Sequence, residues 1–200
     1  MAKSESSEYI LPIYKDRALK HMVQLAGGKK AIKYLSPEQL KAMKIARDKV
    51  AQDMQFNQLK WFRPFPYQKK FFKTGKEFSR RGMIAANRAG KTIASTFETA
   101  YHLTGIYPPD WDGKVWDKPI VAMCAGESWE QVAKTLQSKL LGCDDIKQGY
   151  KLGSGTIPKD KIDEKSIRSD GANVLAIEVW HISGGKSKLY FSNYTQQVRH

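Results

Sequence analysis

The chain has 200 residues, of which 41% are hydrophobic and 27% are charged, a balance typical of folded globular proteins and not of disordered ones. No apolar run reaches the roughly 18 residues that a membrane-spanning helix needs, and the N-terminus lacks the basic-then-apolar layout of a signal peptide. The net charge of +14 is uneven, because residues 1–82 hold 19 of the 34 basic residues and only 7 of the 20 acidic ones.

This charge and the two cysteines bear on the partner and the compartment. A basic N-terminal segment favours contact with a polyanion such as nucleic acid, although a solvated lysine-rich helix has the same composition. Cys124 and Cys143 lack metal-ligand spacing and a histidine cluster, so we expect free thiols in a reducing compartment. The expected location is the cytoplasm, with no contact to a membrane.

The first 60 residues form a predicted basic, helical region. Ser36, with Pro37 after it and Gln39 three residues on, has the pattern of a capping box. A helix is therefore predicted to begin at Pro37. Its apolar side chains recur at helical spacing: Leu40, Met43, Val50 and Met54.

A second predicted region, residues 61–200, begins with the aromatic and proline-rich connector WFRPFPY at 61–67. A short basic amphipathic helix is predicted over 68–78. A short buried strand is predicted over 82–86, running directly into the sequence AANRAGKT, and a helix then begins at Gly90.

A second strand is predicted at 119–125, followed by a helix that Ser128 and Gln131 cap. Residues 142–173 are polar and contain glycine, and little regular structure is expected there. Two later segments predict a hairpin: 174–182 and 188–194. Successive strand–helix units predict an α/β fold with a parallel sheet and helices on its faces, as in P-loop NTPases.

The segment Ala85–Thr92 matches the phosphate-binding loop G-x-x-x-x-G-K-[ST], except that alanine stands in the first position. Gly90 lets phosphate approach the backbone, Lys91 reaches the β- and γ-phosphates of ATP, and Thr92 offers a hydroxyl to Mg²⁺. The remaining predicted contacts with the nucleotide are Ala86, Asn87, Arg88 and Ala89. A simple basic turn is the alternative interpretation.

Three further side chains are candidates for the same site. Arg88 is placed to stabilise charge on the γ-phosphate in the transition state, so Arg88 and Lys91 are the candidate catalytic residues; the alternative for Arg88 is a solvated or intersubunit ion pair. Tyr67 and Gln68 offer a ring to stack on adenine and an amide to bond its edge. Anchoring of the connector is the alternative for Tyr67.

The sequence resembles the large subunits of tailed-phage terminases. The resemblance covers residues 61–142, with a weaker likeness around the hairpin, and rests on linked segments: PFPYQKKFF, AANRAGKT, HLTGIYPPDW and PIVAMCAGESWEQVAKTLQSKLLG. It implies the ATPase part of a DNA-packaging motor that binds ATP and Mg²⁺, with Gln68 in the adenine-sensing position and Arg88 as the loop arginine.

The resemblance also implies partners and further parts. The partners are double-stranded DNA, a small terminase subunit, a portal protein and other copies in a homo-oligomeric ring, transiently on the procapsid. The family's acidic strand-end pair and its nuclease region have no convincing match here, because Leu140–Asp145 has the pattern of a helix end and Glu178 lacks an acidic neighbour. The chain is therefore expected to be an N-terminal piece that binds ATP, and hydrolysis by it is left open.

Two other functions stay open. A different P-loop helicase or translocase has the same glutamine and loop arrangement. A non-catalytic DNA-binding or assembly module would depend less on Lys91 than on lysines of the N-terminal region: Lys29, Lys30, Lys33, Lys41 and Lys44.

Overall fold

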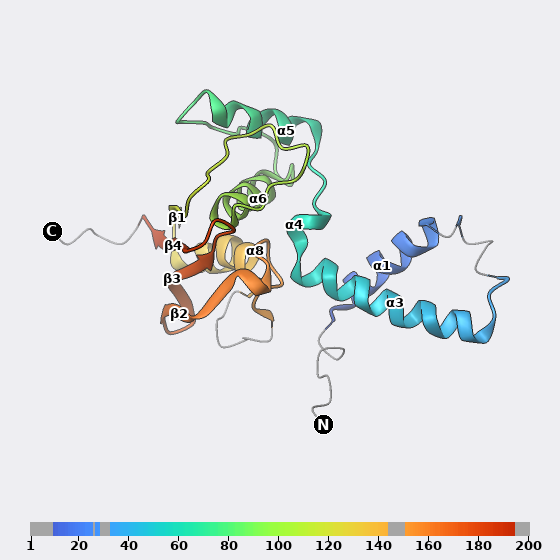
Figure 1. Ribbon diagram of the computed structural model, residues 1–200. Coiled ribbons are helices and arrows are strands. Elements are labelled where there is room, and N and C mark those ends of the chain that lie inside the picture. Colours follow the sequence, from blue (N-terminus) through green and yellow to red (C-terminus); the bar gives the residue numbers. More distant parts are fainter. Residues whose placement is uncertain (1–9, 26, 29–32, 144–150, 195–200) are drawn as a thin grey trace. The chain divides into compact units, whose positions relative to one another are not determined.

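The computed structural model describes residues 10–25, 27–28, 33–143 and 151–194 (Figure 1). The chain divides into two units, residues 1–56 and 57–200. Among the described residues, no helix is both long and apolar enough to cross a membrane.

The first unit contains two helices that pack against each other, α1 (Pro12–Leu25) and α3 (Pro37–Phe56). The predicted capping box is confirmed, because the Gln39 N–H donates to Ser36 Oγ at 3.3 Å and the Ser36 N–H donates to Gln39 Oε1 at 2.8 Å. The buried side chains described in this unit form a small core: Ile10, Ala18, Ala51, Met54 and Gln55.

The second unit begins with short helices and one longer helix: α4 (Gln58–Trp61), α5 (Pro66–Lys73), the 3₁₀ turn η2 (Thr74–Lys76) and α6 (Lys91–Thr104). A helical run follows the first strand: α7 (Trp129–Gln131), the π-helical turn η3 (Val132–Gln137) and α8 (Ser138–Leu141). The predicted cap at Ser128 is confirmed, because Ser128 Oγ accepts from the Gln131 N–H at 3.2 Å. The helix from position 90 and the helix after Ser128 are as predicted, whereas α4 was not predicted and α5 begins at Pro66, inside the predicted connector, and ends before residue 78.

Four strands form one sheet in the order β1-β4-β3-β2: β1 (Val121–Gly126), β2 (Ile162–Asp170), β3 (Asn173–Trp180) and β4 (Lys186–Asn193). β1 and β4 pair in parallel, whereas β4–β3 and β3–β2 are antiparallel. The predicted hairpin is confirmed, whereas a parallel arrangement is found in one of the three strand pairings, β1–β4, so the sheet is mixed. Short turns join β2 to β3 and β3 to β4, and a short turn reverses the chain direction.

Strand β2 lies in the segment 142–173, for which the sequence predicts little regular structure. It follows the 3₁₀ turn η5 (Lys159–Lys161). Ile162 is the one buried side chain of its sequence IDEKSIRSD, so the alternation of apolar and polar residues that identifies a strand is weak. Residues 144–150 of the same segment lie outside the described residues.

The core of the second unit lies between α6, the α7–α8 run and the sheet. Its buried side chains include Phe97, Tyr101, Leu103, Leu140, Leu141, Ile177, Val179 and Leu189. Tyr107 and Trp111, from the aromatic segment after α6, pack against this cluster. Helix α6 is thus held in place by the core, and the predicted phosphate loop immediately precedes its N-terminus.

The predicted strand at 82–86 is wrong. These residues have no regular secondary structure, and Ile84 is fully exposed to solvent. A strand needs a neighbour to accept its backbone hydrogen bonds, yet β1 pairs with β4 on one side and, in the part of the chain that the structure describes, no strand lies on its other side. The loop is therefore preceded by an irregular, exposed segment.

Candidate phosphate-binding loop

The loop closes on itself immediately before α6. The Ala89 N–H donates to Ala86 O at 3.3 Å, and the Ala94 N–H donates to Gly90 O at 2.9 Å as the first bond of the helix. Arg88 has φ +62°, the one positive φ among the described non-glycine residues, and Gly90 has φ +80° at the N-cap. A left-handed residue at the N-cap explains why glycine stands there.

Helix α5 holds the loop from the side through Tyr67 and Gln68. The Tyr67 hydroxyl donates to Ala89 O, and Gln68 Nε2 donates to Gly90 O at 3.1 Å. A Cβ on Gly90 would lie 3.1 Å from Gln68 Nε2, so a side chain here would crowd this contact. The structure thus brings the predicted upstream pair to the predicted loop.

Tyr67 and Gln68 differ in how much of each side chain is exposed and free of hydrogen bonds. Gln68 is 1% exposed, and its Oε1 accepts from the Phe65 N–H at 2.9 Å, so both ends of its amide are bonded to backbone. Tyr67 is 43% exposed, and its ring lies 5.8 Å from the Phe65 ring in a stacked arrangement. An aromatic surface is therefore open beside the loop, whereas Gln68 supports the loop backbone.

Lys91 turns back over the loop. Its Nζ donates to Ala85 O at 2.6 Å and to Ala86 O at 2.9 Å, so the ammonium group lies against the carbonyls that open the loop. Asn87 and Arg88 are exposed at the tip, and Thr92 lies on the first turn of α6. Two cationic side chains thus lie beside a helix N-terminus, an arrangement that favours an anion.

No grouping of His, Cys, Asp and Glu side chains in the described ranges could hold a metal ion. Glu178 lies in β3 with Lys186 at 3.3 Å and Lys188 at 3.8 Å from its carboxylate, and the predicted helix end Leu140–Asp145 is described only as far as Cys143. The Thr92 hydroxyl is thus the one predicted magnesium ligand that the structure places at the loop.

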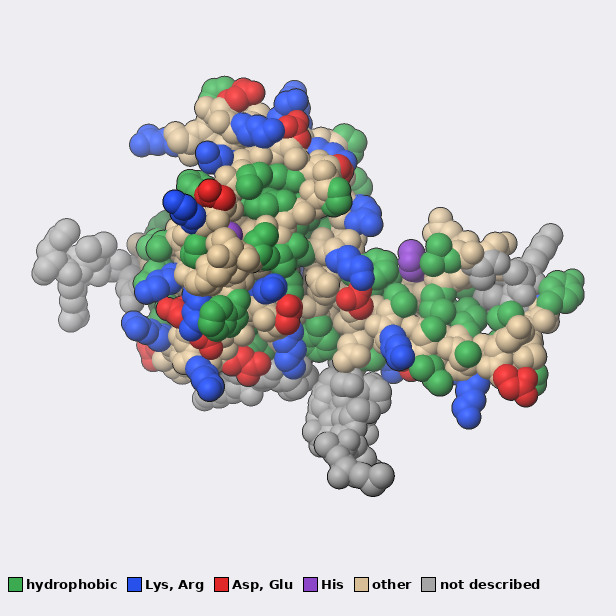
Figure 2. Space-filling view, viewed as in Figure 1, with side chains coloured by type: hydrophobic (Ala, Val, Ile, Leu, Met, Phe, Trp, Pro, Cys, Tyr) green, Lys and Arg blue, Asp and Glu red, His purple; other side chains and the backbone are tan. Residues whose placement is uncertain are grey.

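Several lysines of the basic segment around α5 pair within the chain. Lys69 lies 2.6 Å from Asp110, and Lys73 and Lys76 lie 3.1 Å and 2.5 Å from Asp112. Hydrogen bonds from these lysines hold the pKa of each carboxyl below its usual range. Basic and acidic side chains are interspersed over the face drawn in Figure 2, so the net charge does not gather there in one patch.

One cluster of polar side chains was not identified from the sequence: Arg81, Glu98 and His102. Glu98 and His102 have the i, i+4 spacing of neighbours on a helix face, which was the available signal. Arg81 lies far from both in sequence, and no local pattern links it to Glu98.

The second unit is thus a mixed α/β domain in which a glycine-lysine-threonine loop opens a helix that is buried against the sheet. No protein-family model and no solved structure matches the chain. The terminase large subunit of Salmonella phage P22 is 34% identical over 113 residues, which covers 50% of this chain and 22% of that protein. The chain is therefore related to the terminase large subunit, and it spans about a fifth of that relative's length.

Proposed function

We propose that the second unit binds ATP through the loop Ala85–Thr92 and that it serves a phage DNA-packaging motor of the terminase type. The observation that carries the proposal is the convergence of α5 and α6 on this loop: Tyr67 and Gln68 hold its end, and Lys91 and Thr92 form the turn that follows. The relationship to the terminase large subunit supports the choice of motor.

Each residue has a role in this proposal. The loop amides and Lys91 bind the phosphates, Thr92 contributes its hydroxyl to a nucleotide-bound Mg²⁺, and the exposed ring of Tyr67 stacks on the base. Arg88 lies at the tip, where its guanidinium is free to approach the γ-phosphate. Gln68 acts through the loop backbone.

The partners follow from the same proposal. They are double-stranded DNA, a small terminase subunit, a portal protein and further copies of the chain in a ring. In the first unit Lys33, Lys41 and Lys44 are exposed, which suits contact with a polyanion; Lys29 and Lys30 lie outside the described residues. Salt-dependent retention of DNA tests this part separately, because release of counterions makes such binding weaken steeply with salt.

Binding of a fluorescent ATP analogue tests the nucleotide site. We expect the wild-type chain to bind it in the presence of Mg²⁺, and Lys91→Ala to lower the affinity at least tenfold, about 1.4 kcal/mol, because the variant loses a charge-assisted phosphate contact. Lys134→Ala is the matched control, since Lys134 forms an exposed ion pair with Glu130 on another helical segment. Equal affinity of Lys91→Ala and the wild type would show that the loop is not the site.

A further inference from the structure

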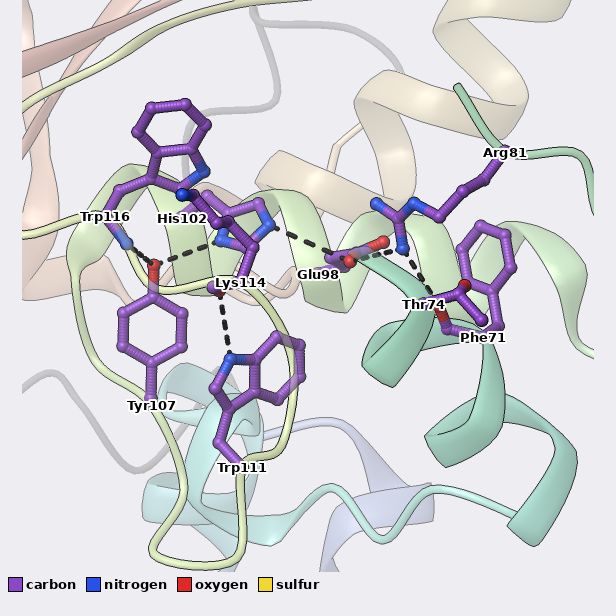
Figure 3. A network of polar contacts seen from close by, with 9 residues as sticks. All are labelled: Phe71, Thr74, Arg81, Glu98, His102, Tyr107, Trp111, Lys114 and Trp116. Carbon is purple, nitrogen blue, oxygen red and sulfur yellow. Dashed lines mark hydrogen bonds and ion pairs between the residues drawn. The ribbon is translucent and has the colours of Figure 1, made fainter. Parts of the chain in front are cut away.

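A largely buried ion pair joins Arg81, in the segment that follows η2, to Glu98 on α6 (Figure 3). Arg81 Nη1 lies 3.0 Å from Glu98 Oε1, with side chains 20% and 8% exposed. The same Nη1 donates to Phe71 O at 2.9 Å, and the guanidinium lies 4.6 Å from the Phe71 ring centroid. Arg81 therefore ties the second half of α5 to the middle of α6.

The pair continues into a chain of polar contacts. His102 Nε2 lies 3.8 Å from Glu98 Oε1, one turn further along α6. His102 Nδ1 lies 3.0 Å from the Tyr107 hydroxyl, which accepts from the Trp116 N–H at 2.9 Å.

The position of Arg81 in the chain relates this network to the loop. Arg81 lies in the irregular stretch between η2 and α6, and it is an anchored residue directly before the mostly exposed segment 82–89. The other end of the segment is Gly90, whose carbonyl accepts from Gln68 on α5. Both ends are thus fixed to the same helix, one through Phe71 O and one through Gln68.

From this arrangement we infer that Arg81 and Glu98 are positioning residues for the loop Ala85–Thr92. They set where the segment before the loop starts relative to α6, and so where Lys91 and the loop amides lie. The inference rests on the proposed nucleotide site for its functional consequence, and its structural part stands separately. Gly75 supports it, because a Cβ at this glycine would lie 3.0 Å from Arg81 Nη1 and would push the guanidinium aside.

Hydrogen–deuterium exchange of the whole chain tests the structural part. In Glu98→Gln and Arg81→Gln, we expect severalfold faster exchange in peptides covering 82–97, which include the first helical bond from Ala94 to Gly90. Exchange in β3 and β4 should stay as in the wild type. Glu130→Gln is the matched control, because it makes the same substitution in an exposed ion pair with Lys134.

The affinity for the fluorescent ATP analogue tests the functional part. We expect it to fall severalfold in Glu98→Gln, Arg81→Gln and Gly75→Ala, with Glu130→Gln unchanged. If the wild type binds no analogue but exchange over 82–97 still rises in the variants, the positioning role stands and the proposed function fails.

Two results would overturn the positioning role. One is wild-type exchange over 82–97 in folded Glu98→Gln and Arg81→Gln chains. The other is a uniform rise of exchange that includes β3 and β4, since the pair would then stabilise the whole unit and not the loop in particular. Gly75→Ala keeps both charges, so a local rise of exchange in this variant separates displacement of the guanidinium from loss of the ion pair.

Discussion

Two sets of ion pairs connect α5 and the residues that follow it to the rest of the second unit, and they differ in burial. Lys69, Lys73 and Lys76 pair with Asp110 and Asp112 at the surface, with every side chain at least half exposed. The Arg81–Glu98 pair is largely buried. Water and dissolved ions screen the exposed pairs and reach the buried pair poorly. Ion pairs with similar N–O distances therefore differ in how much they stabilise the fold.

This difference changes how the basic segment is interpreted. In the sequence, the lysines of α5 and η2 and the arginine at position 81 look alike, as charges available to a polyanion. In the structure three of the lysines are paired in exposed, exchangeable contacts, whereas Arg81 is committed to the interior. Only the exposed lysines can shift to a polyanion at little cost, so Arg81 serves the fold of the loop.

Removal of the buried partner should have the largest effect. We expect Glu98→Ala to lower the free energy of unfolding by about 2–4 kcal/mol, because it leaves the Arg81 guanidinium largely buried without its counter-charge. Urea unfolding at pH 7 measures this change. Glu130→Ala removes the carboxylate of an exposed pair and should leave the midpoint unchanged; equal midpoints for the two variants would contradict the distinction between buried and exposed pairs.

A smaller effect should come from the loop itself, which neither set of pairs touches. Arg88 adopts φ +62°, a region that costs a non-glycine residue about 1 kcal/mol or more. Arg88→Gly should therefore unfold at a higher urea concentration than Arg88→Ala, although both variants lose the guanidinium. The expected difference in the free energy of unfolding is about 0.5–1 kcal/mol. If Arg88→Ala proves as stable as Arg88→Gly, the left-handed conformation is not a feature of the protein in solution.

Local patterns were sufficient to predict much of this structure. The caps at Ser36 and Ser128, helix α6 between Gly90 and Gly105, and the hairpin β3–β4 are all set by residues close in sequence. The spacing between Tyr67-Gln68 and the loop predicted that these residues belong to one site. Their contacts with the loop carbonyls depend on how α5 packs, which no pattern specifies.

The wrong predictions have a common physical cause. An apolar run such as Met83–Ala86 predicts a strand, but a strand also needs a paired neighbour, and β1 offers none in the described structure on its free edge. The direction of β2 and β3 depends on turns and on long-range pairing. Arg81 and Glu98 are likewise joined by a long-range contact, which sequence periodicity does not show.

The smallest expected effect concerns the exposed pairs and is best seen through pH and salt. The pKa of Asp110 is lowered mainly by its hydrogen bond from Lys69, and the pKa of Asp112 mainly by the bond from Lys76. A lowered carboxyl pKa in the folded state gives stability that is present above the unfolded value, near 3.8, and is lost as the pH falls through the folded value.

Asp112→Asn should therefore shift the urea midpoint slightly at pH 7, and the shift should vanish both at pH 2 and in about 1 M salt, where the screening length is only about 3 Å. Arg81→Gln should keep most of its larger shift in the same salt, because its partner is buried. Urea titrations at the two pH values, with and without salt, measure both variants side by side. A salt-resistant shift in Asp112→Asn would mean that Asp112 acts through packing of the 107–116 segment on α5, and the contrast between exposed and buried pairs would then fail for this carboxylate.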